Sequence, residues 1–327
     1  MRPIPTQQDV SPAIFQDIRA AAEPVVLKGL VADWPIVRGG DAAAYLRGLA
    51  SAKPVQFMRA PHEVAGRLHY GEGVDGRNFE HGEGTLAAFL DMLAQASVDR
   101  PEALALQGLP APDYLPGFAA ANPMPLLQAA IFPRLWIGNA VKVATHHDPS
   151  ENIACVAAGR RRFTLFPPEQ VGNLYMGPFN PTPAGVQVSM VHVTAPDLDR
   201  FPRFAAAMAA AVTAELEPGD ALYIPYQWYH HVEALDAFNV LVNYWWDPAR
   251  ADIGSPWDAM MLGLMGLRTL PADQRRAWRA MFDHYVFLAN GDPGAHLAAD
   301  ARGILAATSP QDVALMRRAL LAKLQQG

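Results

Sequence analysis

The sequence of 327 residues contains a single cysteine, Cys155, and no long uninterrupted run of apolar residues. One cysteine cannot form an intrachain disulfide, and it favours a reducing compartment. No stretch of about 18 consecutive apolar residues occurs, so no membrane-spanning helix is predicted. The first residues, MRPIPTQQDVSP, also lack the apolar run of a signal peptide. These absences predict a cytoplasmic protein that makes no contact with a membrane.

Charged side chains are scarce, and the balance between the two signs is acidic. Only 18% of the residues are charged, against roughly 25% in an average globular protein. The formal net charge is -6, so the chain has no basic surface of the kind that binds nucleic acid or anionic lipid. With 51% hydrophobic residues, it can instead form a large core or an apolar subunit interface.

Between residues 135 and 248, short runs of Val, Ile, Phe, Tyr and Trp alternate with turn residues. The clearest runs are NIACVAAG, RRFTLFPP, DALYIP and FNVLVNYWW. Short strands in such a series, with no helix between most of them, predict an antiparallel sandwich or barrel. Upstream, the sequence predicts helices over 15–23 and 85–96 and a buried strand between Pro24 and Pro35.

After residue 250 the strand pattern ends and three helices are predicted instead. The last of them has Ser309 in the N-cap position and Pro310 in the first helical position. An apolar stripe at helical spacing follows: Val313, Met316, Leu320 and Leu324. Such a stripe either packs on the rest of the chain or forms a two-fold dimer interface. The sequence therefore predicts a domain over 1–250 and a helical segment over 251–327 that is a candidate for homodimerisation.

The first of two histidine doublets precedes an acid, as His146–His147 before Asp148. Side chains along a strand alternate between its two faces. His146 and Asp148 therefore share a face, whereas His147 points to the other side. This His-x-Asp pattern at a strand end supplies two of the three ligands of a metal site.

The second doublet, His230–His231, lies at the end of another strand-like run. By the same alternation, His230 shares a face with Val232 and Ala234, whereas His231 shares one with Glu233. Apolar neighbours indicate the inward face. The pattern therefore predicts His230 as the third ligand and His231 as a residue that faces solvent.

Two imidazoles and one carboxylate form the facial triad that binds non-haem Fe(II). The triad occupies one face of the ion and leaves three positions for a bidentate co-substrate and dioxygen. A single His-x-Asp pattern also occurs in ordinary strands, so the residues alone leave a purely structural role open.

Three stretches resemble the cupin-like branch of the JmjC-domain 2-oxoglutarate oxygenases: HHDPSENIACVAAGRRRFTLFPPEQ, PGDALYIPYQWYHHVEAL and VNYWW. The resemblance is dense from about 135 to 248 and weaker over 20–130. It implies a mainly β fold with a double-stranded β-helix core, which is the jelly-roll of cupin and JmjC proteins. N-terminal α/β elements and a C-terminal helical segment would flank this core.

The resemblance also implies roles for individual residues. It places Fe(II) on His146, Asp148 and His230, in agreement with the alternation of faces. It places the distal carboxylate of 2-oxoglutarate on Arg161, where many relatives have lysine. Arginine keeps the positive charge and can bind a carboxylate through two parallel hydrogen bonds.

Further family positions lie around the co-substrate, and this sequence keeps only some of them. The positions that match are Asn152, Asn243 and Trp245. The hydroxyl donor that the family carries just before His-x-Asp is absent, because Val143 or Ala144 stands there. A tyrosine that contacts the co-substrate in the family falls near Ala105. Some contacts to 2-oxoglutarate must therefore differ from those of the family.

The implied activity is oxidation of an unactivated C–H bond by dioxygen, with decarboxylation of 2-oxoglutarate to succinate. The substrate would be a peptidyl side chain or a small molecule, and oxidation of an N-methyl group would amount to demethylation. Two other functions fit the residues. One is a cupin-type isomerase or hydrolase that uses Zn or Mn on the same ligands and does not need Arg161. The other is a non-enzymatic binding module with a structural metal.

Overall fold

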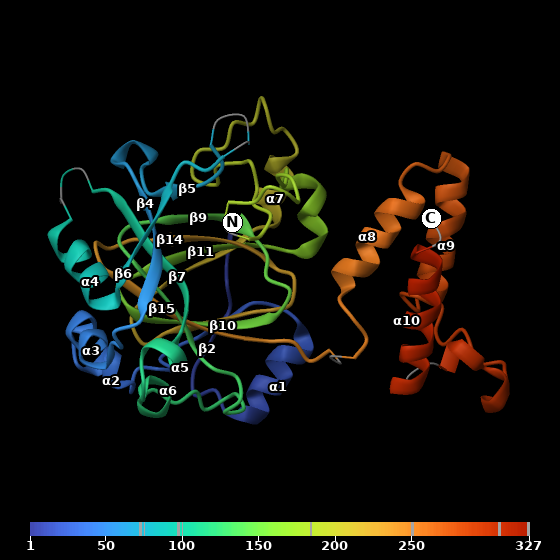
Figure 1. Ribbon diagram of the computed structural model, residues 1–327, viewed down its shortest axis with the longest axis horizontal. Coiled ribbons are helices and arrows are strands. Elements are labelled where there is room, and N and C mark those ends of the chain that lie inside the picture. The colour runs from blue at the N-terminus through green and yellow to red at the C-terminus, as the bar shows by residue number, and fades with distance from the viewer. Residues whose placement is uncertain are drawn as a thin grey trace. The chain divides into compact units, whose positions relative to one another are not determined.

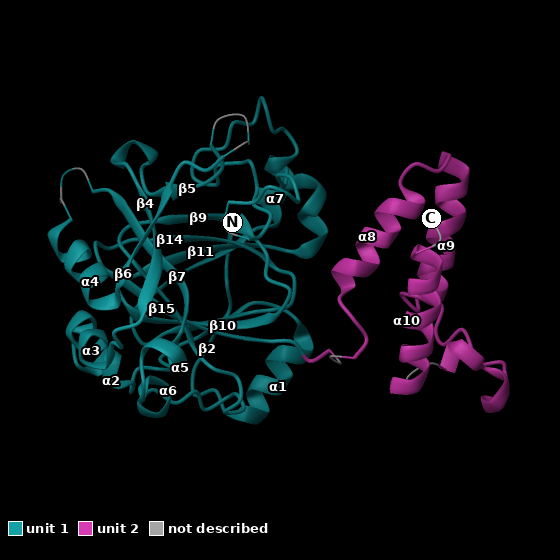
Figure 2. Ribbon diagram, viewed as in Figure 1, with its two compact units in different colours: residues 1–247 teal, residues 248–327 magenta. Residues whose placement is uncertain are grey.

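The computed structural model describes residues 1–71, 74, 76–96, 99, 101–183, 185–249, 252–306 and 309–325. The chain divides into two compact units, residues 1–247 and residues 248–327 (Figures 1 and 2). Every strand among the described residues belongs to the first unit, and the second unit is helical. No helix in the described part of the chain is long and apolar enough to cross a bilayer.

The strands of the first unit, many of which are labelled in Figure 1, are β1 Arg2–Pro3, β2 Thr6–Gln7, β3 Val25–Leu27, β4 Pro54–Ala60, β5 Arg67–Leu68, β6 Glu80–Thr85, β7 Ala103–Pro110, β8 Arg134–Gly138, β9 Lys142–His146, β10 Glu151–Ala158, β11 Arg161–Phe166, β12 Val212–Leu216, β13 Ala221–Ile224, β14 Tyr229–Ala234 and β15 Asn239–Trp246. Its helices are α1 Pro12–Ala21, α2 Pro35–Arg38, α3 Ala42–Leu49, α4 Leu86–Gln95, α5 Ala111–Tyr114, α6 Phe118–Ala121 and α7 Phe204–Ala210. The second unit contains α8 Pro256–Leu267, α9 Ala272–Tyr285 and α10 Pro310–Leu324.

The strands form two sheets. One has the order β1-β12-β11-β14-β9-β5, and the other has the order β2-β3-β13-β10-β15-β8-β7-β4-β6. Within them, the antiparallel sets β12-β11-β14-β9 and β13-β10-β15-β8 are the two halves of a jelly-roll. The predicted fold, a jelly-roll core with N-terminal α/β elements and a C-terminal helical segment, is therefore confirmed.

Strand β10 is buried on both of its faces, which explains why NIACVAA carries almost no polar residue. Ala154 and Val156 pack inside the jelly-roll against residues of β11 and β15. Ile153 and Cys155 point the other way, into the core that the N-terminal helices form on the outside of the sheet. Cys155 is a buried free thiol.

Two predicted elements differ from those observed. Helix α1 begins at Pro12 rather than at residue 15, because the Ser11 side chain accepts a hydrogen bond from the Ile14 amide and caps the helix there. The strand expected between Pro24 and Pro35 ends at Leu27. Gly29 then adopts a left-handed backbone conformation with φ of 69°, which turns the chain out of the extended conformation.

The helices of the second unit have no buried residue of their own. None of the residues in α8, α9 or α10 is buried, although all three helices carry large apolar side chains. Ser255 and Ser309 cap α8 and α10 through side-chain hydrogen bonds to Trp257 and Asp312 amides. Ser309 is the N-cap that the sequence predicts.

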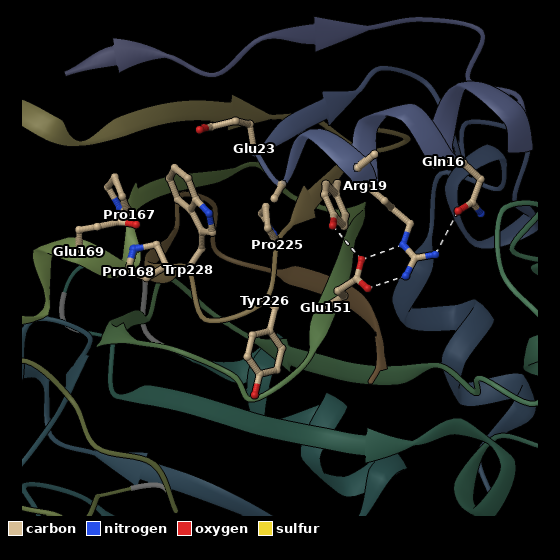
Figure 3. A pocket seen from close by; sticks show the side chains of 13 residues that line it. Gln16, Arg19, Glu23, Glu151, Pro167, Pro168, Glu169, Pro225, Tyr226 and Trp228 are labelled. Carbon is tan, nitrogen blue, oxygen red and sulfur yellow. Dashed lines mark hydrogen bonds and ion pairs between the residues drawn. The ribbon is translucent and has the colours of Figure 1, made fainter. Parts of the chain in front are cut away.

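A buried carboxylate joins α1 to the start of β10 (Figure 3). The Glu151 side chain accepts hydrogen bonds from Arg19 Nε at 2.8 Å, from Arg19 Nη2 at 2.5 Å and from the Tyr223 hydroxyl at 2.8 Å. Burial alone would raise the pKa of Glu151, but these hydrogen bonds outweigh it and hold the pKa below its ordinary value of 4.5. This network anchors the start of β10 at Glu151, which is one residue before Asn152.

We expect Glu151→Gln to lower the free energy of unfolding by about 2 kcal/mol at pH 7, because it breaks a largely buried ion pair. Since the folded-state pKa is depressed, the contribution of Glu151 is complete above pH 4.5 and disappears as the pH falls through the folded-state value. The variant should therefore lose less stability than the wild type on acidification. Urea unfolding at pH 7 and at pH 4 measures both effects.

Glu169 is a matched control, because it lines the same surface cavity but is exposed (Figure 3). Glu169→Gln should leave both measurements unchanged. Equal stability of Glu151→Gln and wild type at pH 7 would contradict the proposed role of the ion pair.

Candidate metal centre and co-substrate cavity

His146, Asp148 and His230 converge inside the jelly-roll. His146 is the last residue of β9 and lies directly opposite His230 of β14 in the antiparallel register. The two rings lie 4.3 Å apart between centroids, and His230 Nε2 lies 3.6 Å from Asp148 Oδ2. One potential ligand atom from each of the three residues lies within 4.8 Å of the others. This set could hold a metal ion.

Backbone carbonyl groups orient both imidazole rings. His146 Nδ1 is 2.8 Å from the carbonyl oxygen of Ala144, and His230 Nδ1 is 3.1 Å from that of Trp228. A carbonyl can only accept, so each Nδ1 donates and each neutral ring keeps a lone pair on Nε2. Burial lowers the pKa of His230 to about 4. The His230 ring is therefore neutral near pH 7, as metal binding requires.

The side-chain amides of Asn152 and Asn243 form a hydrogen-bonded chain that leads to Asp148, the third candidate ligand. Asn152 Nδ2 lies 3.5 Å from Asp148 Oδ2, and Asn152 Oδ1 accepts a 2.9 Å hydrogen bond from Asn243 Nδ2. Asn152 and Asn243 come from neighbouring strands, β10 and β15. This arrangement orients the Asp148 carboxylate. Asn243 Oδ1 is buried and finds no hydrogen-bond donor among the described residues.

The other histidine of each doublet, His147 or His231, lies outside the set of three candidate ligands. His147 packs edge-on against the Tyr229 ring, with centroids 5.0 Å apart. The prediction that His231 faces solvent is wrong, because His231 is only 6% exposed and Glu233 only 7% exposed. Residues 191–194 lie beside His231 on the outer side of the sheet and cover it. The alternation of faces identified the correct side for each histidine, but it could not reveal this covering segment.

Arg161 lines an inner cavity together with all three residues of the His146–Asp148–His230 set. Its side chain is buried, with 4% of its surface exposed, and Nη2 donates a 3.3 Å hydrogen bond to the Trp136 carbonyl. Arg161 Nε has no acceptor, and no carboxylate of the described residues forms an ion pair with the guanidinium. Burial lowers the pKa of Arg161 to about 10, so it remains positively charged near pH 7.

Trp245 lies in the wall of this inner cavity and also in the wall of a second, outer cavity. Its ring meets Trp136 edge-to-face, with centroids 5.8 Å apart. Both cavities also share His146 and Asp148. The candidate metal ligands therefore lie where the two cavities meet.

The donor atoms and the charges in this region fit an iron ion and a dicarboxylate. Two imidazole nitrogens and one carboxylate are the protein ligands of the facial Fe(II) triad. A buried arginine without a counter-ion is costly, and a carboxylate that enters the inner cavity would supply the missing partner. Apart from Asn152 and Asn243, most of the other side chains that line that cavity are apolar, with Phe163, Ile224 and Leu241 among them.

Sequence reasoning missed several residues of the two cavities. Trp136 lines both of them, and Gln107 lines the outer one. Gln107 follows Ala105 by two residues along β7, so the alternation of faces could have indicated it. Ala105 itself is buried among apolar side chains, as the loss of the family's tyrosine at this position would suggest. The sequence carried no signal for Trp136 beyond its place at the start of the strand-rich stretch 135–248.

The comparison with known proteins agrees with this geometry. The model of the cupin-like domain family matches residues 11–252. A similar protein is the lysine-specific demethylase JMJ31 of Arabidopsis thaliana, with 34% identity over 112 residues, 34% of this chain and 20% of the relative. The human HSPB1-associated protein 1 is 39% identical over 113 residues, 34% of this chain and 22% of the relative.

A longer match reaches the lysine-specific demethylase 8 of Xenopus tropicalis, with 28% identity over 231 residues. It covers 68% of this chain and 48% of that relative. The matched stretches thus span less than half the length of each of these relatives. By its fold and by the match over residues 11–252, the chain belongs to the cupin-like domain family of JmjC-type oxygenases, which use Fe(II) and 2-oxoglutarate.

Proposed function

We propose that this chain is an Fe(II)- and 2-oxoglutarate-dependent oxygenase that hydroxylates a peptidyl side chain or a small molecule. His146, Asp148 and His230 would hold the iron, and Arg161 would pair with the distal carboxylate of 2-oxoglutarate. The observation that carries the proposal is the convergence of the three ligand atoms within 4.8 Å, with both Nδ1 atoms engaged by carbonyl groups.

Iron and 2-oxoglutarate, when bound, supply the oxidation, in which one oxygen atom of dioxygen enters the substrate and 2-oxoglutarate becomes succinate and carbon dioxide. The protein contributes geometry and charge. The Ala144 and Trp228 carbonyls hold the two Nδ1 atoms, which would leave the Nε2 lone pairs available to the ion. Asn152 and Asn243 orient the Asp148 carboxylate.

Arg161 provides the counter-charge for a dicarboxylate in the inner cavity. Because no carboxylate of the described residues pairs with it, the guanidinium is available to a ligand. The apolar side chains around it exclude water and strengthen this charge pair. Trp245 and Asn243 would complete the wall next to the co-substrate.

We expect Asp148→Ala to lower succinate production from 2-oxoglutarate at least about 100-fold, because it removes a metal ligand.

Arg161→Ala should raise the KM for 2-oxoglutarate at least about 30-fold through loss of a buried charge-assisted pair, and Arg161→Lys should restore part of the affinity for 2-oxoglutarate. Assays with Fe(II) and ascorbate measure both. His147→Ala is the control, because His147 lies outside the set, and its turnover should stay close to that of wild type.

The same assay separates the other functions. An isomerase or hydrolase that uses Zn or Mn would bind metal through the same residues without producing succinate. A non-enzymatic module would show metal-dependent stability and no turnover. Unchanged succinate production in Asp148→Ala would contradict the oxygenase proposal.

We further propose that residues 1–250 act as the catalytic domain and that residues 251–327 join two copies of the chain. The support is the absence of buried residues in α8, α9 and α10, which leaves large apolar side chains exposed. A second copy would cover them in a symmetric interface.

We also propose a cytoplasmic location, in line with the single, fully buried cysteine.

We expect the wild type to be a dimer and the double variant Met316→Asp, Leu320→Asp to be a monomer, because two charges in an apolar interface oppose association. Light scattering after size exclusion measures the mass. Leu198→Asp is the matched control, since Leu198 lies in the first unit and is 44% exposed, against 45% for Leu320. A monomeric wild type would refute the proposed assembly.

A further inference from the structure

The two cavities that meet at the candidate metal ligands differ in polarity. The inner cavity contains Arg161, Asn152 and Asn243, which suit a charged and polar ligand. The outer cavity contains none of these three residues. The two cavities would therefore hold chemically different molecules at the same metal, with the co-substrate in the inner one and the molecule to be oxidised in the outer one.

Apolar side chains form most of the outer cavity. They come from five strands, from the residue just before β6 and from the segment before Ser189, and they include Met58, Leu68, Phe79, Trp136, Val143 and Val188. Apart from His146 and Asp148, no ionisable side chain of the described residues lines this cavity. Gln107 is the one uncharged amide in the described wall. A charge on the occupant would therefore be buried without a partner.

Arginine side chains already lie against two of the aromatic walls. The Arg134 guanidinium carbon is 5.7 Å from the Trp245 ring centroid, and that of Arg77 is 5.9 Å from the Phe79 ring centroid. Recognition of a methylated ammonium group needs aromatic faces that are free to receive it and benefits from a nearby acid. Here two positive charges flank the walls and would repel a second cation, and the one acid in the described wall, Asp148, would be engaged by the metal.

We propose that the outer cavity receives an uncharged, apolar side chain and that a C–H bond of this side chain is hydroxylated. The reaction would therefore not be the removal of a methyl group from a methylated lysine or arginine. This inference rests on the proposed oxygenase function. In the reaction, the C–H bond becomes C–OH with one atom of dioxygen, and the other atom enters succinate as 2-oxoglutarate loses carbon dioxide.

A pair of peptides with the same shape and different charge tests this inference. The first peptide is acetyl-Gly-Gly-X-Gly-Gly-amide, in which X is trimethyllysine. In the second, a carbon atom replaces the quaternary nitrogen of X, so that the side chain is neutral. The iron-loaded full chain is assayed for succinate with each peptide. We expect the neutral peptide to give a kcat/KM at least about tenfold higher, and its product to gain the mass of one oxygen atom.

A variant tests the electrostatic cause. Arg134→Gln removes one of the flanking charges, so the ratio between the two peptides should fall by about threefold or more relative to wild type. Because the ratio is taken within each variant, a change in overall activity cancels. Arg38→Gln is the matched control, since Arg38 is exposed on α2 and pairs with Asp33. It should keep the wild-type ratio.

Three results would overturn the inference: equal stimulation by both peptides, preference for the trimethyllysine peptide with release of formaldehyde, or stimulation by neither. Succinate formation without any peptide tests the proposed function separately. If the wild type converts 2-oxoglutarate in an Asp148-dependent manner and the neutral peptide is still not preferred, the oxygenase proposal stands and only the substrate class fails.

Discussion

The candidate centre depends on the register between β9 and β14, which places His146 opposite His230. In a strand, a slip of one residue exchanges the two faces. Such a slip would bring His147 or His231 into the jelly-roll in place of the proposed ligand. On the inner face Val143 and Val232 also lie opposite each other, and the register is irregular between this pair and the histidine pair, so that β9 has one residue more than β14 there. The metal geometry is therefore a consequence of how the two strands pack.

Several buried polar side chains of the jelly-roll interior lie close to the three candidate ligands. Asn152 and Asn243 lie next to Asp148, and Arg161 lies in the inner cavity without a carboxylate partner among the described residues. Apolar side chains surround them, so each charge acts in a medium that screens it weakly. One strand, β10, links this interior to the N-terminal helices, because Glu151 at its start binds Arg19 of α1. Strand β10 therefore contributes both to the stability of the fold and to the geometry of the site.

Much of the fold and the positions of the candidate ligands could be predicted from the sequence, because they follow from local periodicity. The alternation of faces distinguished His146 from His147, and the structure brings His146, Asp148 and His230 together. Local periodicity could not predict what covers an outer face, and so His231 was expected in solvent. It also gave no signal for Trp136, whose place in the cavities depends on how distant strands pair.

The most direct test of the account is X-ray absorption on the protein loaded with Fe(II) without oxygen, which counts the imidazole ligands of the metal. The account predicts two imidazoles in the wild type, one in His146→Ala and one in His230→Ala. It predicts that two remain in His147→Ala and in His231→Ala. A count of two in His230→Ala, or a loss in His231→Ala, would show that the metal lies elsewhere and would contradict the account.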